Sequence, residues 1–484
     1  MRRQAYQWLW LLVGISLFWA ATLLQQNLKT LQVDQNLSFR DDAQVAPELS
    51  IALSMGVFRS IILDVLWMRA SALQQEKRFY EIVQLYDLIG KLQPHNPRVW
   101  SYSAWNMAYN ISVELPPGEE RWRWVQNGLK RLIDHGLRYN PHDLELYKQT
   151  AWIYSHKIGR NLDDAHLYYK TRLYEQVYDI TGPDFSAVQT AEHLISENPS
   201  VVASAANVQT QLKEKLGLEL ELMIKLEKDP FLGPLDWRLP QVQAIYWAKK
   251  GLANNRFGTK VIDLERLTYQ AQQHILRQGK LVYIPASDKN AARLISWPDY
   301  RQALPMQNMF QRQIELFTQQ GSTSSGVLSA YRAFLDEAIH ILILAGQDDV
   351  AETLFQKANA FIPNFLPAID AKTLMREQLS AQLSSMSGDE FSAMVSSFLL
   401  RHFWWKAMSD NQQSSALLQH AQQMWIVNTQ KNKTAERSIN RSFQDIKFSI
   451  LKDIFDSRLF HPSVLEKLMA SLPFDLKDRL REKK

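Results

Sequence analysis

The chain has no cysteine among its 484 residues. Disulfide bonds and lipidation at cysteine are therefore excluded, so that even an exported chain of this sequence must rely on packing alone. Glycine is scarce, with 17 residues, and no segment sustains the apolar–polar alternation of a half-buried strand. Together with abundant Leu, Ala, Gln, Lys and Glu, these absences predict an all-α fold.

The sequence also lacks the common catalytic and cofactor-binding motifs H-E-x-x-H, G-x-S-x-G, the P-loop and G-x-G-x-x-G. Glu337 and His340 have the spacing of di-iron helical bundles, but the second such motif and the extra carboxylates are missing. Asp163, Asp164 and His166 stand at a predicted helix start, where aspartates favour the positive end of the helix dipole. We therefore predict no catalytic residue, no cofactor and no metal, and we expect that the protein is not an enzyme.

Charge of one sign is not concentrated anywhere. The net charge of +5 results from 55 basic and 50 acidic side chains, and the basic tail at 477–484 is interrupted by Asp478 and Glu482. Nucleic acid is therefore not expected as a partner.

Long hydrophobic runs are absent except at the N-terminus. Trp8–Leu24 is uncharged and long enough to cross a bilayer as a helix. Because Arg2 and Arg3 precede it, the N-terminus is expected in the cytoplasm and the bulk of the chain outside, in the periplasm if the source is bacterial. The alternative is a cleaved signal peptide, although no A-x-A site follows the run.

Amphipathic helix pairs recur along the rest of the chain. Residues 67–94 predict two helices separated by the polar break Gln74–Arg78 and closed by Pro94. Two further segments align with each other, PHNPRVWSYSAW from Pro94 and PHDLELYKQTAW from Pro141, so that Trp100 falls opposite Tyr147.

A later copy, from Tyr331 to Pro363, has Gly346 at its turn and the pattern Ala351-x3-Phe355 with Ala358 and the final proline. These segments resemble the tetratricopeptide repeat, whose unit of roughly 34 residues has an aromatic residue, small residues and a final proline at similar offsets. The resemblance implies an α-solenoid of helix pairs.

The expected organisation follows from these segments. Between the repeats we expect a helix at Val208–Glu227, a short strand in LVYIP and a flexible linker at Gly321–Gly326. The predicted divisions are a transmembrane anchor (1–28), a spacer (29–57), helical repeats (58–183), an irregular helical insertion (184–326), another repeat (327–375) and a C-terminal helical region (376–484).

The resemblance also implies a partner-binding groove lined by the first helix of each pair. The family's offsets place eight residues there: Arg98, Ser101, Trp105, Tyr109, Glu145, Lys148, Trp152 and His156. Asp336 and His340 take the equivalent places in the late copy. Tryptophan, tyrosine and arginine supply much of the binding energy at interfaces. The alternative is that Trp105 and Trp152 only pack between helices.

Three functions are compatible with the sequence. The first is a membrane-anchored scaffold that binds a protein or peptide partner in an envelope or membrane complex. The second is a carbohydrate-active or sugar-binding envelope protein, in which some of the 15 tryptophans stack on sugar rings. The third is a component of a membrane secretion or export machine, with the N-terminal helix contacting partner helices.

Overall fold

The computed structural model describes most of the chain from Phe58 onward. Its described residues are Val13, Ser16 and Trp19, followed by 58–255, 261–284, 293–319, 325–367, 369–375, 377, 388–431, 442–456 and 460–481. Apart from those first three residues, the predicted anchor at Trp8–Leu24 and the spacer at 29–57 lie outside this set. None of the helices formed by described residues combines the length and the apolar character that a membrane span requires.

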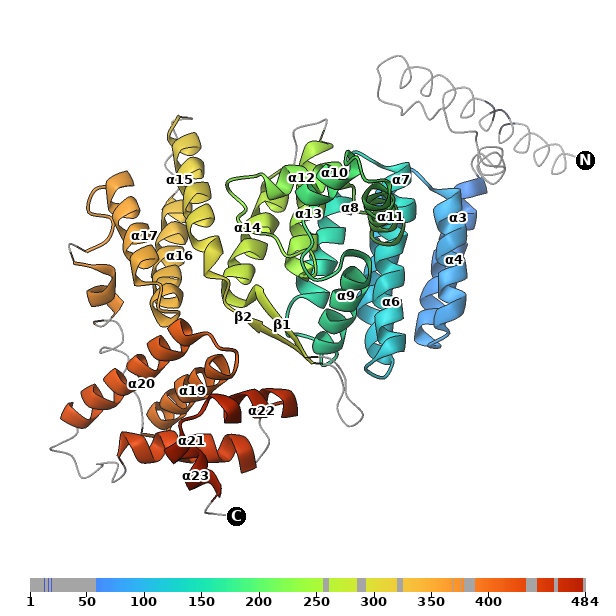
Figure 1. Cartoon of the computed structure of the whole chain (residues 1–484). Coiled ribbons are helices and arrows are strands. Elements are labelled where there is room, and N and C mark those ends of the chain that lie inside the picture. The colour runs from blue at the N-terminus through green and yellow to red at the C-terminus, as the bar shows by residue number, and fades with distance from the viewer. Residues whose placement is uncertain are drawn as a thin grey trace, which may run out of the picture. The chain divides into compact units, whose positions relative to one another are not determined.

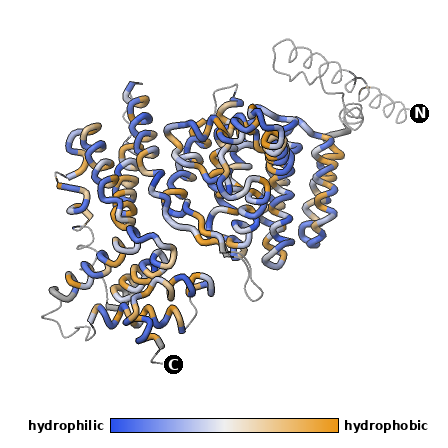
Figure 2. The backbone as a smooth tube through the Cα atoms, viewed as in Figure 1, coloured by the Kyte–Doolittle hydropathy of each residue, from blue (hydrophilic) through white to orange (hydrophobic). Residues whose placement is uncertain are grey.

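The described chain is mostly helical, as the composition predicts, and it divides into two compact units. Unit 1 is Met1–Pro116 with Arg123–Gln149, and unit 2 is Pro117–Trp122 with Thr150–Lys484. Figure 2 shows polar and apolar positions alternating along the helices, the pattern of helices that bury one face.

Unit 1 is built from short helices with two π-helical turns, η1 and η3, and one 3₁₀ turn, η2. The helices that begin in this unit or supply most of their residues to it are α3 (Phe58–Gln75), α4 (Phe79–Leu92), α5 (Pro97–Trp105), η1 (Asn106–Ile111), η2 (Ser112–Glu114), α6 (Glu119–Lys130), η3 (Arg131–Gly136), α7 (Leu137–Tyr139) and α8 (Leu144–Trp152).

The first helix pair of unit 1, α3 and α4, breaks where the sequence predicts, because Lys77 adopts a left-handed backbone conformation with φ of 58°. The two helices lie side by side (Figure 1). The buried face of α4 is formed by Ile82, Tyr86 and Ile89, at helical spacing. Tyr80 is exposed although its place in the apolar pattern suggests burial.

Unit 2 continues with another π-helical turn and a longer series of helices. Its elements up to the hairpin are η4 (Ile153–Ile158), α9 (His166–Thr181), α10 (Ala187–Leu194), α11 (Pro199–Leu216), α12 (Leu220–Glu227), α13 (Pro240–Ala253), α14 (Val261–Gln278), β1 (Lys280–Ile284) and β2 (Arg293–Trp297). The elements after the hairpin are η5 (Tyr300–Gln302), α15 (Ala303–Gln319), α16 (Ser325–Leu344), α17 (Asp348–Phe361), α19 (Gly388–Ala407), α20 (Asn411–Lys431), α21 (Phe443–Asp456), α22 (Pro462–Ser471) and α23 (Phe474–Arg481).

Three details of unit 2 bear on the sequence predictions. The predicted strand exists: β1 pairs antiparallel with β2, with Lys280 opposite Trp297. The single helix expected at Val208–Glu227 is wrong, because Gly217 has φ of 69° and ends α11, so that α12 begins anew at Leu220. Helix α16 already begins at Ser325, inside the predicted linker.

The late helix pair α16–α17 and the C-terminal helices each enclose an apolar core. Gly346, with φ of 68°, forms the turn of the pair, and Ala351, Phe355 and Ala358 are buried. Helices α19 to α23 gather at one end of the picture in Figure 1. Their core is rich in aromatic rings, among them Trp405, which lies 5.1 Å from Trp297 of the hairpin between ring centroids.

Candidate functional site

The two aligned segments start their helices in the same way. Asn96 accepts a hydrogen bond from the Arg98 N–H (3.2 Å), and Asp143 accepts one from the Leu146 N–H (3.1 Å). Both are N-caps, which satisfy an N–H group that the first turn of a helix leaves without a partner. Helix α5 and helix α8 thus begin 47 residues apart.

The aromatic residue of each segment closes the turn that precedes its helix. Trp100 donates a hydrogen bond from Nε1 to the Pro94 carbonyl (2.8 Å), and Tyr147 donates one from its hydroxyl to the Pro141 carbonyl (2.9 Å). The alignment of Trp100 with Tyr147 therefore corresponds to the same contact in the structure.

The eight predicted groove residues do not all belong to one unit. Arg98 through Tyr109, with Glu145 and Lys148, fall in unit 1, whereas Trp152 and His156 fall in unit 2. Arg98 and Trp105 are exposed, and the remaining six residues of the set are half-buried: Ser101, Tyr109, Glu145, Lys148, Trp152 and His156.

Three pairs within this set are in contact, and the third, Trp105 with Tyr109, belongs to the aromatic row described next. Lys148 Nζ lies 3.2 Å from a carboxylate oxygen of Glu145, one helical turn away, so that much of its charge is offset. The rings of Trp152 and His156 stack with centroids 4.5 Å apart. Partial burial and the charges of Arg160 and Lys157 lower the pKa of His156, which favours the neutral ring.

Unit 1 presents a continuous row of aromatic rings, which we call the aromatic face: Trp67, Tyr102, Trp105 and Tyr109. Ring centroids along the row are 5.4 Å (Trp67–Tyr102), 6.5 Å (Tyr102–Trp105) and 6.1 Å (Trp105–Tyr109) apart. Tyr102 is 45% exposed and Trp105 is 39% exposed. These separations are typical of interacting aromatic pairs, so the row forms one surface.

A buried polar network supports the aromatic face from the π-helical turn η1. Asn106 is fully buried and exchanges hydrogen bonds with the Gln74 amide (3.2 and 3.3 Å). It also donates to the Tyr86 hydroxyl (2.5 Å) and accepts from Asn110 (2.8 Å). Because every member is neutral, this network holds η1 in place without burying a charge.

A second buried network in unit 2 is ionic. Asp163 is bonded to Lys157 (2.5 Å), to Arg121 (2.9 Å) and to the Ala165 N–H (2.9 Å), and Arg121 also contacts Asp164. Burial alone would raise the pKa of Asp163, but the hydrogen bonds from Lys157 and the Ala165 N–H hold that pKa well below its usual range. Burial lowers the pKa of Lys157 against the effect of its carboxylate partner. These contacts account for Asp163 without a bound metal.

Unit 2 also contains a cavity of about 100 Å³, which we call the Lys170 cavity. Its polar lining comes from the segment before α9, from α9, from the start of α13 and the segment before it, from α14 and from β2: Asn161, His166, Lys170, Arg238, Gln241, His274, Gln278 and Ser296. Lys170 Nζ donates to Asn161 (2.7 Å) and to His166 Nδ1 (3.3 Å). Gln241 Nε2 lies 3.0 Å from His274 Nδ1 and 3.3 Å from the Gly159 carbonyl oxygen.

Burial shifts the titratable groups of the Lys170 cavity towards their neutral forms. It lowers the pKa of Lys170 to about 8. Burial and then the charges of Lys170, Arg277 and Arg160 lower the pKa of His274 to about 4. Burial and the Lys170 charge also lower the pKa of His166, against a smaller effect of Asp163.

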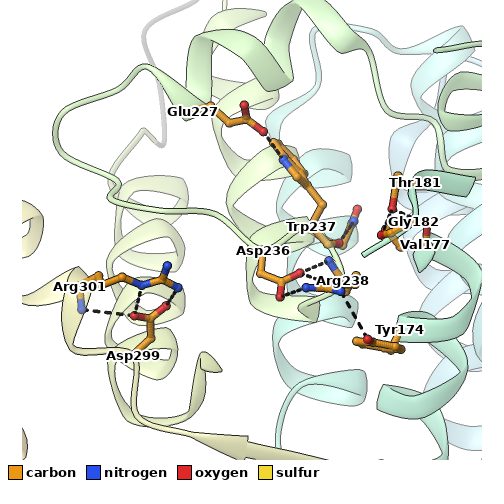
Figure 3. A network of polar contacts seen from close by, with 11 residues as sticks. Tyr174, Val177, Thr181, Gly182, Glu227, Asp236, Trp237, Arg238, Asp299 and Arg301 are labelled. Atoms are coloured by element: carbon orange, nitrogen blue, oxygen red, sulfur yellow. Dashed lines mark hydrogen bonds and ion pairs between the residues drawn. The ribbon is translucent and has the colours of Figure 1, made fainter. Parts of the chain in front are cut away.

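The segment before α13 places Arg238 at this cavity. Figure 3 shows the Arg238 guanidinium bound to both carboxylate oxygens of Asp236 (2.8 Å each) and directed at the Tyr174 hydroxyl (3.3 Å). Trp237 points the other way and donates to Glu227 (2.8 Å). The two hydrogen bonds to Asp236 largely offset the charge of Arg238. The same figure shows a similar ion pair between Asp299 and Arg301.

Sequence reasoning missed the Lys170 cavity because its lining comes from segments far apart in the chain. Two partial signals existed: the cluster Asp163–His166, and the segment 231–240, dense in apolar and turn residues, that ends in Arg238. Glu337 has structural partners: it forms an ion pair with Arg277 and accepts a hydrogen bond from Gln273 (3.1 Å). Over the described residues, no group of three or more His, Asp or Glu side chains is arranged to hold a metal ion.

Comparison of the chain with protein-family models, with curated proteins and with solved structures finds no match.

Proposed function

We propose that this protein is a membrane-anchored helical-repeat scaffold, tetratricopeptide-like in its helix pairs, whose aromatic face binds a segment of a partner protein. The observation that supports the proposal is the row Trp67, Tyr102, Trp105 and Tyr109, with Tyr102 and Trp105 substantially exposed. Exposed aromatic rings arranged side by side are costly to leave in water and are typical of interaction sites.

The spacing of these residues places them on one face of a helix. Arg98, Tyr102, Trp105 and Tyr109 follow one another at intervals of four, three and four residues across α5 and η1, which is the spacing of one helical stripe. Arg98 is exposed at the start of this stripe. A partner segment with apolar side chains and a carboxylate, from an acidic residue or a C-terminus, would match a cation next to aromatic rings.

The membrane anchor of this proposal is the apolar run Trp8–Leu24. Its length, its flanking tryptophans and the preceding Arg2 and Arg3 support a span with the N-terminus in the cytoplasm. In this proposal, the aromatic face lies outside the cytoplasm, and the anchor holds it near the membrane.

The sugar-binding alternative has less support from the described tryptophans. Most of them are buried, including Trp100, Trp122, Trp237 and Trp247, and cannot stack on a ligand. Among the described residues from Phe58 onward, Trp105 is the tryptophan with a substantially exposed ring. Glu145 and Glu114, two carboxylates of unit 1, are each paired with a lysine.

The aromatic face can be tested by site-specific photo-crosslinking with the full-length chain in membranes. Benzoylphenylalanine replaces Tyr102 on the aromatic face or, as a matched control, Tyr178, which is 40% exposed in unit 2. We expect a discrete protein adduct from position 102 and none of the same mass from position 178. Arg98→Glu combined with Trp105→Ala should abolish the adduct while the helical circular-dichroism signal is unchanged.

An adduct that survives this double substitution, or that forms equally from both positions, would contradict the proposed binding surface. Carbonate extraction of the same membranes tests the anchor. Full-length chain recovered in the soluble fraction would show that Trp8–Leu24 does not span the bilayer.

A further inference from the structure

The Lys170 cavity differs from the rest of the interior of unit 2 in its charge. Its polar lining consists of cations, imidazoles, side-chain amides and the Ser296 hydroxyl, and no Asp or Glu is among the described residues that line it. Lys170 has amide and imidazole partners but no carboxylate partner among the described residues. Its pKa is lowered because burial removes water from a cation without supplying a counter-charge.

A cation held in this way lacks a compensating anion. A buried charge is normally paired, because desolvation makes an unpaired one costly. Two other cations of the same unit have such a partner: Lys157 pairs with Asp163, and Arg238 pairs with Asp236. Lys170 is the exception at this cavity, and the space beside it is open.

We propose that the Lys170 cavity binds a small organic carboxylate, with the Lys170 ammonium as its counter-charge and with Ser296, Gln241 and the imidazoles of His166 and His274 as neutral hydrogen-bonding partners. This site is independent of the aromatic face, which belongs to unit 1.

The charge of the lining selects a monoanion. Asp236 already offsets the Arg238 guanidinium through two hydrogen bonds, and His274, with a pKa of about 4, is neutral at pH 7. One net positive charge therefore remains, which matches a carboxylate. A phosphate monoester carries about 1.5 to 2 negative charges at pH 7 and would leave part of its charge unpaired.

The volume of the cavity limits the size of the ligand. Drug-sized ligands occupy pockets of roughly 300–1,000 Å³, whereas this cavity measures about 100 Å³. A nucleotide is too large. A carboxylate with two to four carbon atoms is of the right order, and the apolar wall formed by Leu239 and Leu281 suits its carbon chain.

Protonation of Lys170 gives the site a distinct pH dependence. The groups that face Lys170 or act on its surroundings are His166 on the same helix, His274 and Arg277 on α14, and Arg238 and Arg160 on neighbouring segments. These groups are cationic or neutral, and Asp163, whose charge also acts on His166, stays ionised in this range, so none of them replaces Lys170 as the titrating partner above pH 7. Because only the ammonium form attracts an anion, affinity should fall about tenfold per pH unit once the pH exceeds about 8.

Isothermal titration calorimetry on the purified full-length chain tests this proposal. The probes are acetate, propionate and lactate, with lactamide and propionamide as neutral controls of the same shape and inorganic phosphate as the competing anion. At pH 7 we expect at least one carboxylate to bind at least tenfold more tightly than its amide and more tightly than phosphate. Its affinity should decrease between pH 8 and pH 9.5.

Two substitutions locate the binding. Lys170→Gln should weaken the carboxylate by tenfold or more, whereas Lys225→Gln, at an exposed lysine of α12, should leave it unchanged. Ser296→Leu narrows the cavity from an exposed rim position and should also weaken binding. It provides a second test if Lys170→Gln does not fold.

Four results would overturn the proposal: no carboxylate binding at probe concentrations up to about 10 mM, equal affinity for acid and amide, tighter binding of phosphate, or an affinity that does not change with pH and with either cavity variant. None of these results bears on the crosslinking from Tyr102, so the two proposals fail separately.

Discussion

The two aligned segments, 94–111 and 141–158, form the same local structure from different residues. Each has an N-capped helix, an aromatic donor to the proline carbonyl, a fully buried alanine (Ala104 and Ala151) and a π-helical turn at its end. All of these features recur at a spacing of 47 residues.

The segments differ in their polar interior and in their outward rings. Asn110 of the first segment belongs to a neutral amide network, whereas Lys157, its equivalent in the second, belongs to an ionic one. Trp105 is 39% exposed and stacks with Tyr109, while its equivalent Trp152 is half-buried and stacks with His156. The repeat therefore accommodates either a neutral or an ionic network in its interior, and its outward ring is more exposed in the first segment than in the second.

The largest expected effect is the loss of stability when the ionic network loses its central carboxylate, a group that the amide network does not contain. Asp163→Asn removes the carboxylate that Lys157 and Arg121 share, and all three side chains are almost fully buried. Leaving buried cations without a partner should lower the free energy of unfolding by about 3–5 kcal/mol. Urea denaturation followed by circular dichroism measures this change. The control Asp164→Asn, at a largely exposed carboxylate, should cost less than about 1 kcal/mol.

A smaller loss of stability should appear when the pH is lowered and Asp163 becomes protonated. The pKa of Asp163 is lower in the folded chain than in the unfolded chain, so its contribution to stability is complete above the unfolded value of about 3.9 and is lost as the pH falls below it. Hydrogen exchange, corrected for intrinsic rates, should show η4 and the start of α9 losing protection as the pH falls from about 4 to about 2. The amides of η1, whose side-chain network contains no carboxylate, should lose less. Equal losses in η1 and η4 would contradict this assignment.

The smallest effect tests whether the aligned aromatic residues have equivalent roles. Tyr147→Phe removes the hydroxyl that donates to the Pro141 carbonyl and should cost about 1 kcal/mol in the free energy of unfolding. Tyr178→Phe, at a largely exposed ring, serves as the control and should change stability by less than about 0.5 kcal/mol. If the two variants melt alike, the proline contact does not stabilise the second segment.

The sequence predicts those features that depend on neighbouring residues. Helix pairs, the break at Gln74–Arg78, the late pair with Ala351 and the equivalence of Trp100 and Tyr147 all follow from short-range patterns. The resemblance to the tetratricopeptide repeat implies Trp105 and Tyr109 through the family's offsets, and the structure places their rings in one aromatic row.

Features that depend on distant segments could not be predicted. Asp163 can be recognised as a residue near a helix start, but its pairing with Arg121 requires the fold. Lys170, Arg238 and His274 are separated by dozens of residues and meet only because the fold brings α9, the segment before α13 and α14 around one cavity. The π-helical turns have no known local signature in this sequence, since nothing in NMAYNI or IYSHKI distinguishes them from ordinary helix.

The π-helical turns η1 and η4 stand at equivalent positions of the two aligned segments, while a third, η3 (Arg131–Gly136), lies between them. A π-helical turn accommodates one residue more than an α-helical one, as expected from a single-residue insertion into an existing helix. The turns η1 and η4 each span six residues and stand 47 residues apart. A single insertion in one segment, followed by duplication of that segment, would give this spacing, whereas η3 needs an insertion of its own. Helix α16 of the late pair has no such turn from Ser325 to Leu344.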